Sequence, residues 1–120
     1  GAGSCVVALS SAGAVRAVPA YAAIGSSKGA LEALARHMAA ELAPEGIRVN
    51  VVSPGGVSTQ AWDAFPDKDR RFAEAVARTP LGRLVTPHDV AMLVQFLLSP
   101  AAEAIVGQTL VIDGGARIVE

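Results

Sequence analysis

The sequence predicts an α/β fold in which three parallel strands form one open sheet and helices cross over between them. Largely apolar segments occupy residues 5–9, 47–52 and 109–112. The run at 5–9 has no polar interruption, which is typical of a strand that is covered on both faces. Segments 21–43 and 87–99 space their apolar residues three and four apart, as amphipathic helices do. Strand, helix, strand, helix and strand is the order of a parallel sheet with right-handed crossovers.

The first strand and the first helix are separated by a connection rich in glycine, alanine and proline. The run at 5–9 ends at two serines, and Pro44 is expected to end the helix because proline has no amide hydrogen to donate. The apolar stripe of this helix consists of Leu31, Leu34, Met38 and Leu42. A second face carries only small residues, which predicts close packing against another helix and therefore a subunit contact. These small residues are Gly25, Gly29, Ala30 and Ala33.

The second strand is expected to close at Ser53-Pro54-Gly55-Gly56 with an exposed loop, because proline cannot donate to a ladder and glycine permits tight turns. Residues 58–80 mix aromatic side chains with charges, which predicts one or two short helices in a mobile excursion from the domain. The aromatic residues of this excursion are Trp62, Phe65 and Phe72.

The second helix has a clear start signal. Thr86 can cap the helix, Pro87 fits its first position and Asp89 puts an acid in its first turn. The third strand then ends at the turn Asp113-Gly114-Gly115. Three parallel strands leave unpaired edges, and the strand at 5–9 is too apolar for a free edge. We therefore expect a further partner to pair with it.

Composition excludes several classes of partner. The 120 residues are 52% hydrophobic and 18% charged, with ten Lys and Arg against eleven Asp and Glu, which fits one soluble globular unit. The charges are scattered, so neither nucleic acid nor a membrane surface is an expected partner. No apolar run approaches the roughly 20 residues of a membrane span, and we expect a cytoplasmic protein. Cys5 is the single cysteine, and no Cys/His spacing predicts a metal site.

The only tyrosine of the chain, Tyr21, stands seven residues before Lys28. Seven residues fall about 20° short of two helical turns, so both side chains lie on one face about 10 Å apart. A lysine ammonium can bind the hydroxyl groups of a ligand along this face, and its charge favours ionisation of a nearby phenol. Tyr21 is therefore a candidate proton donor. The alternative is an ordinary half-buried tyrosine and a solvated lysine.

Four features in order resemble the C-terminal half of the short-chain dehydrogenase/reductase superfamily. They are Ser10-Ser11, the Tyr21 and Lys28 pair, GIRVNVVSPGGVST at 46–59 and GQTLVIDGG at 107–115. The resemblance extends over essentially the whole chain. It implies the C-terminal half of a Rossmann-type, doubly wound parallel sheet.

The spacing of Tyr21 and Lys28 points to one branch of this superfamily. The commonest pattern in the superfamily is Tyr-x-x-x-Lys, but the residue four before Lys28 is Ile24. Tyr-(x)6-Lys is instead the arrangement of the divergent enoyl-acyl-carrier-protein reductases, and AWDAFPD and RTPLGRLVTPHDV look most like their NADPH-using bacterial form. In enoyl thioester reduction, charge develops on an oxygen several bonds from the carbon that receives the hydride. A tyrosine set back by nearly one turn suits that more distant oxygen.

The resemblance implies a role for each site residue. Tyr21 would hydrogen-bond the enolate oxygen and relay a proton, and Lys28 would hold the nicotinamide ribose hydroxyls. Ser11 occupies the place of a second tyrosine in the triclosan-sensitive form, and is either a substrate contact or a plain strand-end serine. The aromatic residues of 58–80 either cover an acyl chain or pack in the core.

The loop after the second strand would hold the cofactor. Val57 would meet the carboxamide through its backbone, and Thr59 would lie near the diphosphate. The residues expected to line the nicotinamide are Pro54, Gly55, Val57 and Thr59. The cofactor implied by the resemblance is NADPH, with NADH also possible.

No glycine-rich dinucleotide-binding turn follows a strand in this sequence. That turn belongs to the N-terminal half of the fold, and the start Gly1-Ala2-Gly3 without methionine points to a fragment. Residues 1–120 are therefore expected to form a partial Rossmann-type domain that is inactive alone. A complementary N-terminal half or a homo-oligomer is the expected protein partner.

Three functions remain open at this point. The first is a fragment of an enoyl reductase that acts on a small or carrier-bound acyl thioester of the fatty-acid or polyketide type. The second is a carbonyl or alcohol dehydrogenase with a shifted tyrosine. The third is a truncated, non-catalytic chain that serves as a structural or partner module.

Overall fold

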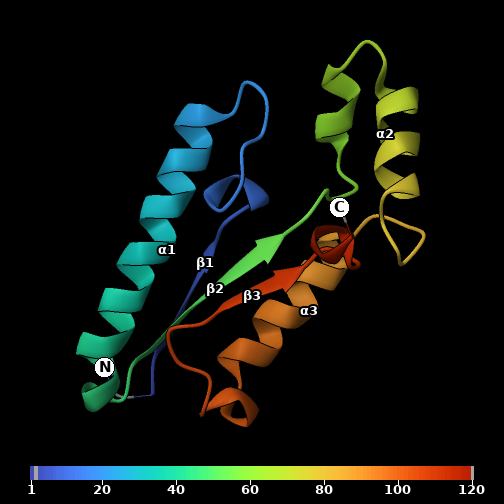
Figure 1. The fold of residues 1–120 in the computed structure, drawn as a ribbon. Helices are drawn as coiled ribbons and strands as arrows, with labels where there is room; N and C mark the ends of the chain where they lie inside the picture. The colour runs from blue at the N-terminus through green and yellow to red at the C-terminus, as the bar shows by residue number, and fades with distance from the viewer. Residues whose placement is uncertain (2, 120) are drawn as a thin grey trace.

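Strand β2 (Arg48–Pro54) is the central strand of a three-stranded parallel sheet. Its neighbours are β1 (Cys5–Leu9) and β3 (Thr109–Ile112). In this computed structural model, which describes residues 1 and 3–119, all three arrows point the same way (Figure 1). In the register, Val7 lies opposite Asn50 and Val52 opposite Leu110. The predicted open parallel α/β sheet is therefore confirmed.

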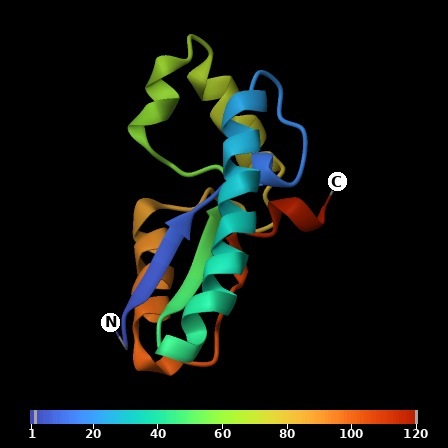
Figure 2. The same ribbon diagram turned by 90° about the vertical axis from the view of Figure 1, so that its left-hand side faces the viewer.

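Two helices cover opposite faces of this sheet, as the two views agree (Figures 1 and 2). Helix α1 (Ala22–Leu42) packs Ala35 and Ala39 against Val49 and Val51 of β2. On the other face, Leu97 of helix α3 (Pro87–Leu98) packs against Val52. Successive side chains of a strand point to opposite faces, so β2 is buried on both. This explains why Val51 and Val52 follow one another in β2 in place of a strict alternation of apolar and polar residues.

The second strand is longer than expected from the sequence. The sequence predicts 47–52 with an end at Ser53, whereas β2 continues through Pro54, which lies opposite Ile112 of β3. Proline is tolerated here because it is the last residue of the strand and still offers its carbonyl. The Gly55 amide then donates to the Ile112 carbonyl at 3.0 Å. The exposed loop therefore begins two residues later than predicted.

The helix ends largely follow the sequence signals. Helix α1 begins after Tyr21, and Pro44 lies in the short turn Ala43–Glu45 (η2) that follows it. At the start of α3 the Thr86 hydroxyl accepts from the Asp89 amide at 3.1 Å, and the Asp89 carboxylate accepts from the Thr86 amide at 2.9 Å. This reciprocal capping box gives hydrogen-bond acceptors to two backbone amides that have no acceptor within the helix. The predicted start of the second helix is confirmed.

The small-residue face of α1 admits a turn of the same chain. A Cβ atom on Gly25 would lie 2.7 Å from the Gly13 carbonyl oxygen, and one on Gly29 would lie 3.4 Å from the Ala14 oxygen. Both oxygens belong to the 3-10 turn Ala12–Ala14 (η1), which follows β1. The expectation that these two glycines pack against a second helix is therefore corrected. They allow the backbone after β1 to approach α1 closely.

The two glycines provide a matched test of this packing. Gly25→Ala should lower the free energy of unfolding by about 1–3 kcal/mol, because the added methyl group overlaps a backbone oxygen. Gly29→Ala should leave it unchanged or raise it by up to about 1 kcal/mol, because alanine favours the helix and meets only an ordinary contact. Urea unfolding followed by circular dichroism measures both changes. Equal losses in the two variants would contradict the assigned close approach.

The excursion after β2 lies beyond the carboxyl ends of the strands (Figures 1 and 2). It contains a 3-10 helix, η3 (Gln60–Ala64), and helix α2 (Lys68–Ala77). The sequence predicts one or two short helices here, and the structure contains two. Within the described part of the chain, no helix has both the length and the apolar character to cross a membrane. The same residues contain no group of three or more His, Cys, Asp or Glu side chains that could hold a metal ion.

Candidate active site

A cavity of about 430 Å³ lies at the carboxyl ends of β1 and β2. Parallel α/β sheets bind ligands at this end of their strands. Segments far apart in the sequence form its wall: the turn after β1, the start of α1, the loop after β2, the 3-10 helix η3 and the turn after β3. We call it the Tyr21 cavity. Its predicted site residues are Ser11, Tyr21, Pro54 and Gly55.

Tyr21 and Ser11 meet in the wall of this cavity. The Tyr21 hydroxyl donates to the Ser11 hydroxyl oxygen at 3.3 Å, and the Gly13 amide donates to the same oxygen at 3.2 Å. The Tyr21 ring packs on Gly13, where a Cβ atom would lie 2.5 Å from two ring carbons. An O–H···O distance of 3.3 Å is longer than the usual 2.7–2.8 Å or so. The phenol hydrogen is therefore held loosely enough to turn toward another oxygen.

Lys28 reaches the same strand end as Tyr21. Its ammonium donates to the Leu9 carbonyl oxygen at 3.0 Å, two residues before Ser11. Tyr21 and Lys28 therefore lie on one side of α1, as their spacing predicts. Lys28 is outside the wall of the Tyr21 cavity formed by the described residues. Its ammonium lies beside the end of β1.

A third contact joins α1 to this strand end and was not found from the sequence. The Ser10 hydroxyl donates to the Glu32 carboxylate at 2.5 Å, and both residues are buried, with 6% and 7% exposure. Three consecutive residues at the carboxyl end of β1 therefore bond to α1 or to its N-cap residue: Leu9 to Lys28, Ser10 to Glu32 and Ser11 to Tyr21. The sequence signal for this contact was Glu32, a carboxylate one helical turn after Lys28 on a helix of small residues.

The residues predicted to hold the cofactor divide into two groups. Pro54, the last residue of β2, and Gly55 line the cavity, whereas Val57 pairs with Val85 in a single parallel bridge. The Val57 carbonyl accepts from the Trp62 indole nitrogen at 2.7 Å. Thr59 is exposed, and its carbonyl accepts from the Trp62 amide at 3.3 Å. The structure brings Pro54 and Gly55 to the Tyr21 cavity, and holds Val57 and Thr59 outside its wall.

The aromatic residues of the excursion pack against one another beside the cavity. Trp62 lines the cavity, and Phe72 packs against it edge to face with ring centroids 5.5 Å apart. The Arg71 guanidinium lies 4.7 Å from the centre of the Phe65 ring. Arg71 also donates to Asp67 at 2.8 Å, and this hydrogen bond holds the pKa of the Asp67 carboxyl below its usual range. Trp62 therefore forms the wall while Phe65 and Phe72 support it.

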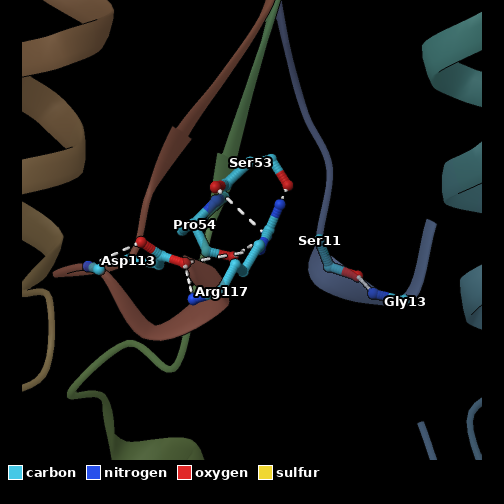
Figure 3. A network of polar contacts seen from close by, with 7 residues as sticks. Ser11, Gly13, Ser53, Pro54, Asp113 and Arg117 are labelled. Atoms are coloured by element: carbon cyan, nitrogen blue, oxygen red, sulfur yellow. Dashed lines mark hydrogen bonds and ion pairs between the residues drawn. The ribbon is translucent and has the colours of Figure 1, made fainter. Parts of the chain in front are cut away.

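Arg117, which sequence reasoning missed, also lines the cavity, and Figure 3 shows its polar contacts. Its Nη2 donates to the Ser53 hydroxyl at 2.8 Å and to the Pro54 carbonyl at 3.2 Å. Asp113 accepts from the backbone amides of Gly115 and Arg117, each at 2.9 Å. Burial lowers the pKa of the Arg117 guanidinium, and the nearby Asp113 charge opposes that shift. The four-residue spacing of Asp113 and Arg117 was the only signal in the sequence.

Comparison with known proteins gives one family and several close relatives. The model of a family described as enoyl-(acyl carrier protein) reductase matches residues 1–117. A tropinone reductase homolog of Arabidopsis thaliana is 42% identical over 118 residues, which cover 98% of this chain and 44% of the relative. The NADH-type enoyl-[acyl-carrier-protein] reductase of Escherichia coli is 40% identical over 116 residues, or 97% of this chain and 44% of the relative. The chain thus spans less than half the length of either relative.

The fold of the chain also matches solved structures. A putative NAD(P)-dependent gluconate 5-dehydrogenase from Beutenbergia cavernae, with NADP bound at low occupancy, superposes with a TM-score of 0.90. It is 38% identical in sequence, and the match covers 97% of this chain and 47% of that chain. The parallel sheet and its two covering helices are therefore an arrangement found within larger dinucleotide-binding proteins.

Proposed function

Because the chain belongs to the short-chain dehydrogenase/reductase superfamily, we propose that it is the C-terminal half of a nicotinamide-dependent enoyl thioester reductase. The observation that carries the proposal is the position of Tyr21 in the cavity wall, hydrogen-bonded to Ser11, with Lys28 on the same side of α1. The family model matched by the chain and the Escherichia coli relative support enoyl reduction as the reaction.

The residues present fit the nicotinamide end of a dinucleotide. The Lys28 ammonium beside β1 is a donor suited to ribose hydroxyls, and the loop at Pro54-Gly55-Gly56 offers backbone with little side-chain bulk next to the cavity. Val57 still has a free lone pair on its carbonyl after accepting from Trp62, and can meet the carboxamide. When bound, the reduced nicotinamide would supply the hydride for the β-carbon of the substrate. One relative has NADH in its name, and one solved structure contains NADP. We therefore propose NADPH as the cofactor of this chain, with NADH as the alternative.

Tyr21 would act on the oxygen of the thioester. Its hydroxyl would donate a hydrogen bond to that oxygen as negative charge develops there, and could then release its proton. Ser11 and the packing of the ring on Gly13 would hold the phenol in place. A proton donor positioned in this way typically increases the reaction rate by a factor of about 10²–10⁴.

The free edge of β1 is the place at which we propose that a nucleotide-binding half joins. The outer edge of β1 has no strand partner among the described residues, and Val6 and Leu9 on this strand are 41% and 49% exposed. We propose that a parallel strand of a complementary N-terminal half pairs there and brings the diphosphate-binding turn. A homo-oligomer and a cytoplasmic location remain our predictions.

Carbonyl reduction is the second candidate, and the contact between Ser11 and Tyr21 favours it. Two hydroxyl groups 3.3 Å apart in one wall can both donate to a single carbonyl oxygen. The tropinone reductase homolog of Arabidopsis thaliana is a relative of comparable identity. The third candidate, a non-catalytic module, requires that the chain never meets a nucleotide-binding half.

The test uses the natural polypeptide that carries residues 1–120, with whatever residues precede Gly1. Oxidation of NADPH and of NADH is followed with a crotonyl thioester and, separately, with a panel of ketones. A deuteride cofactor then locates the label in the product. Deuterium at the β-carbon of the thioester is the expected result, deuterium at a carbinol carbon supports the second candidate, and no turnover by folded protein supports the third.

A further inference from the structure

We propose that Arg117 is a positioning residue that joins the C-terminal turn (residues 113–117) to the cofactor loop (residues 54–59). The contact itself is independent of the proposed function. Its consequence, tighter binding of the nicotinamide, rests on that function. No part of the resemblance or of the comparisons assigns a role to this arginine.

The bonds of Arg117 reach the last two residues of β2. Its Nη2 donates to the Ser53 hydroxyl at 2.8 Å and to the Pro54 carbonyl at 3.2 Å, with the Ser53 carbonyl at 3.5 Å. The Ser53 side chain is fully buried, and the Arg117 side chain is 15% exposed. Hydrogen bonds from a charged donor in a buried place are stronger than those in water. Arg117 therefore fixes the point at which the cofactor loop leaves the sheet (Figure 3).

Asp113 holds the other end of this connection. It accepts from the Arg117 amide and lies 3.7 Å from the Arg117 Nε. Asp113 also packs directly on the cofactor loop, because a Cβ atom on Gly55 would lie 2.7 Å from the Asp113 Cβ. The C-terminal turn thus contacts the start of the loop by packing at Gly55 and by hydrogen bonds at Ser53 and Pro54.

The contacts of Arg117 are not those expected of an arginine that only stabilises the fold. The Arg117 Nε is buried and has no hydrogen-bond partner within the described chain. An unsatisfied buried donor opposes folding. Removing one partner of a buried ion pair is costly when the two groups are tightly bonded, but the Arg117 Nε and the Asp113 carboxylate lie 3.7 Å apart without a hydrogen bond. Asp113 keeps its two backbone donors without the guanidinium. Arg117→Met should therefore spare overall stability and loosen the loop locally, whereas a purely structural arginine would do the reverse.

Amide hydrogen exchange of the natural protein without nucleotide, followed by NMR, measures that difference. The reporters are the Gly55 amide, bonded to Ile112 at 3.0 Å, and the Ser58 amide, bonded to Val85 at 2.8 Å. The reference is the Val51 amide in the middle of β2, bonded to the Gln108 carbonyl at 2.8 Å. Arg117→Met should speed exchange of both reporters about tenfold and leave the reference unchanged. The melting temperature should shift by less than about 4 °C.

Three further variants control the result. Arg36→Met removes an exposed arginine from α1 and should leave every rate unchanged. Arg117→Lys keeps a charged donor and should restore part of the protection. Ser53→Ala removes the acceptor at 2.8 Å, and should add little in the Arg117→Met background because the shared bond is already lost.

The binding of NADPH or NADH supplies the functional readout. In the Arg117→Met protein the dissociation constant should rise about tenfold, with kcat at saturating cofactor changed much less. Unchanged exchange at Gly55 and Ser58 would overturn the proposal, as would faster exchange that includes Val51 together with a large drop in melting temperature. If the unmodified protein binds neither nucleotide, the proposed function fails, and the exchange rates still decide the role of Arg117.

Discussion

Tyr21→Phe should lower the turnover of a crotonyl thioester by about two to four orders of magnitude. The substitution removes one oxygen and keeps the ring, which packs on Gly13. The hydroxyl has one described hydrogen bond, at 3.3 Å to Ser11, so the free energy of unfolding should change by less than about 1 kcal/mol. The loss should fall on kcat, because the hydroxyl acts on charge that exists only in the transition state. Steady-state kinetics with the thioester as the varied substrate measures it.

Ser11→Ala provides the comparison for this result. It removes the partner of the phenol and leaves the proton donor in place, so its loss of kcat should be about tenfold or less. A Tyr21→Phe protein that keeps a tenth or more of the enoyl turnover would remove Tyr21 from the proton path. A larger loss from Ser11→Ala than from Tyr21→Phe would favour the carbonyl reaction, in which both hydroxyls share one oxygen.

The strands and helices were predictable from the sequence where residues close together in the chain determine them. The consecutive valines of β2 indicated a strand covered on both faces, and α1 covers Val51 while α3 covers Val52. The capping box at Thr86 and Asp89 forms from residues three apart, so its parts are visible in the sequence. The spacing of Tyr21 and Lys28 fixes a shared helix face without tertiary information.

The contacts that were missed depend on where distant segments meet. Ser10 and Glu32 are 22 residues apart in sequence, and Arg117 is 64 residues from Ser53. Neither pair has a periodic pattern, and a charged residue on a helix or after a turn is most often solvated. The glycines of α1 were misread for the same reason, because a small residue indicates a close neighbour and does not identify it. Gly13 is that neighbour of Gly25.

Lys28→Met should raise the KM for the nicotinamide cofactor by at least tenfold and lower kcat/KM for that cofactor by about 10²–10³. Each hydrogen bond from a charged group to a ribose hydroxyl contributes roughly 1.5–3 kcal/mol, and an ammonium has donors for both hydroxyls as well as for Leu9. The Leu9 contact is exposed, so water can replace it and stability should change little. Steady-state kinetics with varied NADPH at saturating crotonyl thioester measures the effect.

Lys68→Met is the matched control, because Lys28 and Lys68 are the two lysines of the chain. Lys68 lies on α2 and pairs with Asp63 at 3.1 Å in an exposed position, and its loss should leave both KM values unchanged. The two proposed roles on α1 then have separable signatures, since Tyr21→Phe acts on kcat and Lys28→Met acts first on the cofactor KM. A Lys28→Met protein whose thioester KM rises while its cofactor KM stays constant would instead assign the ammonium to the substrate. In that case the helix face shared by Tyr21 and Lys28 would bind the acyl group, and the nicotinamide would have to be held by the cofactor loop alone.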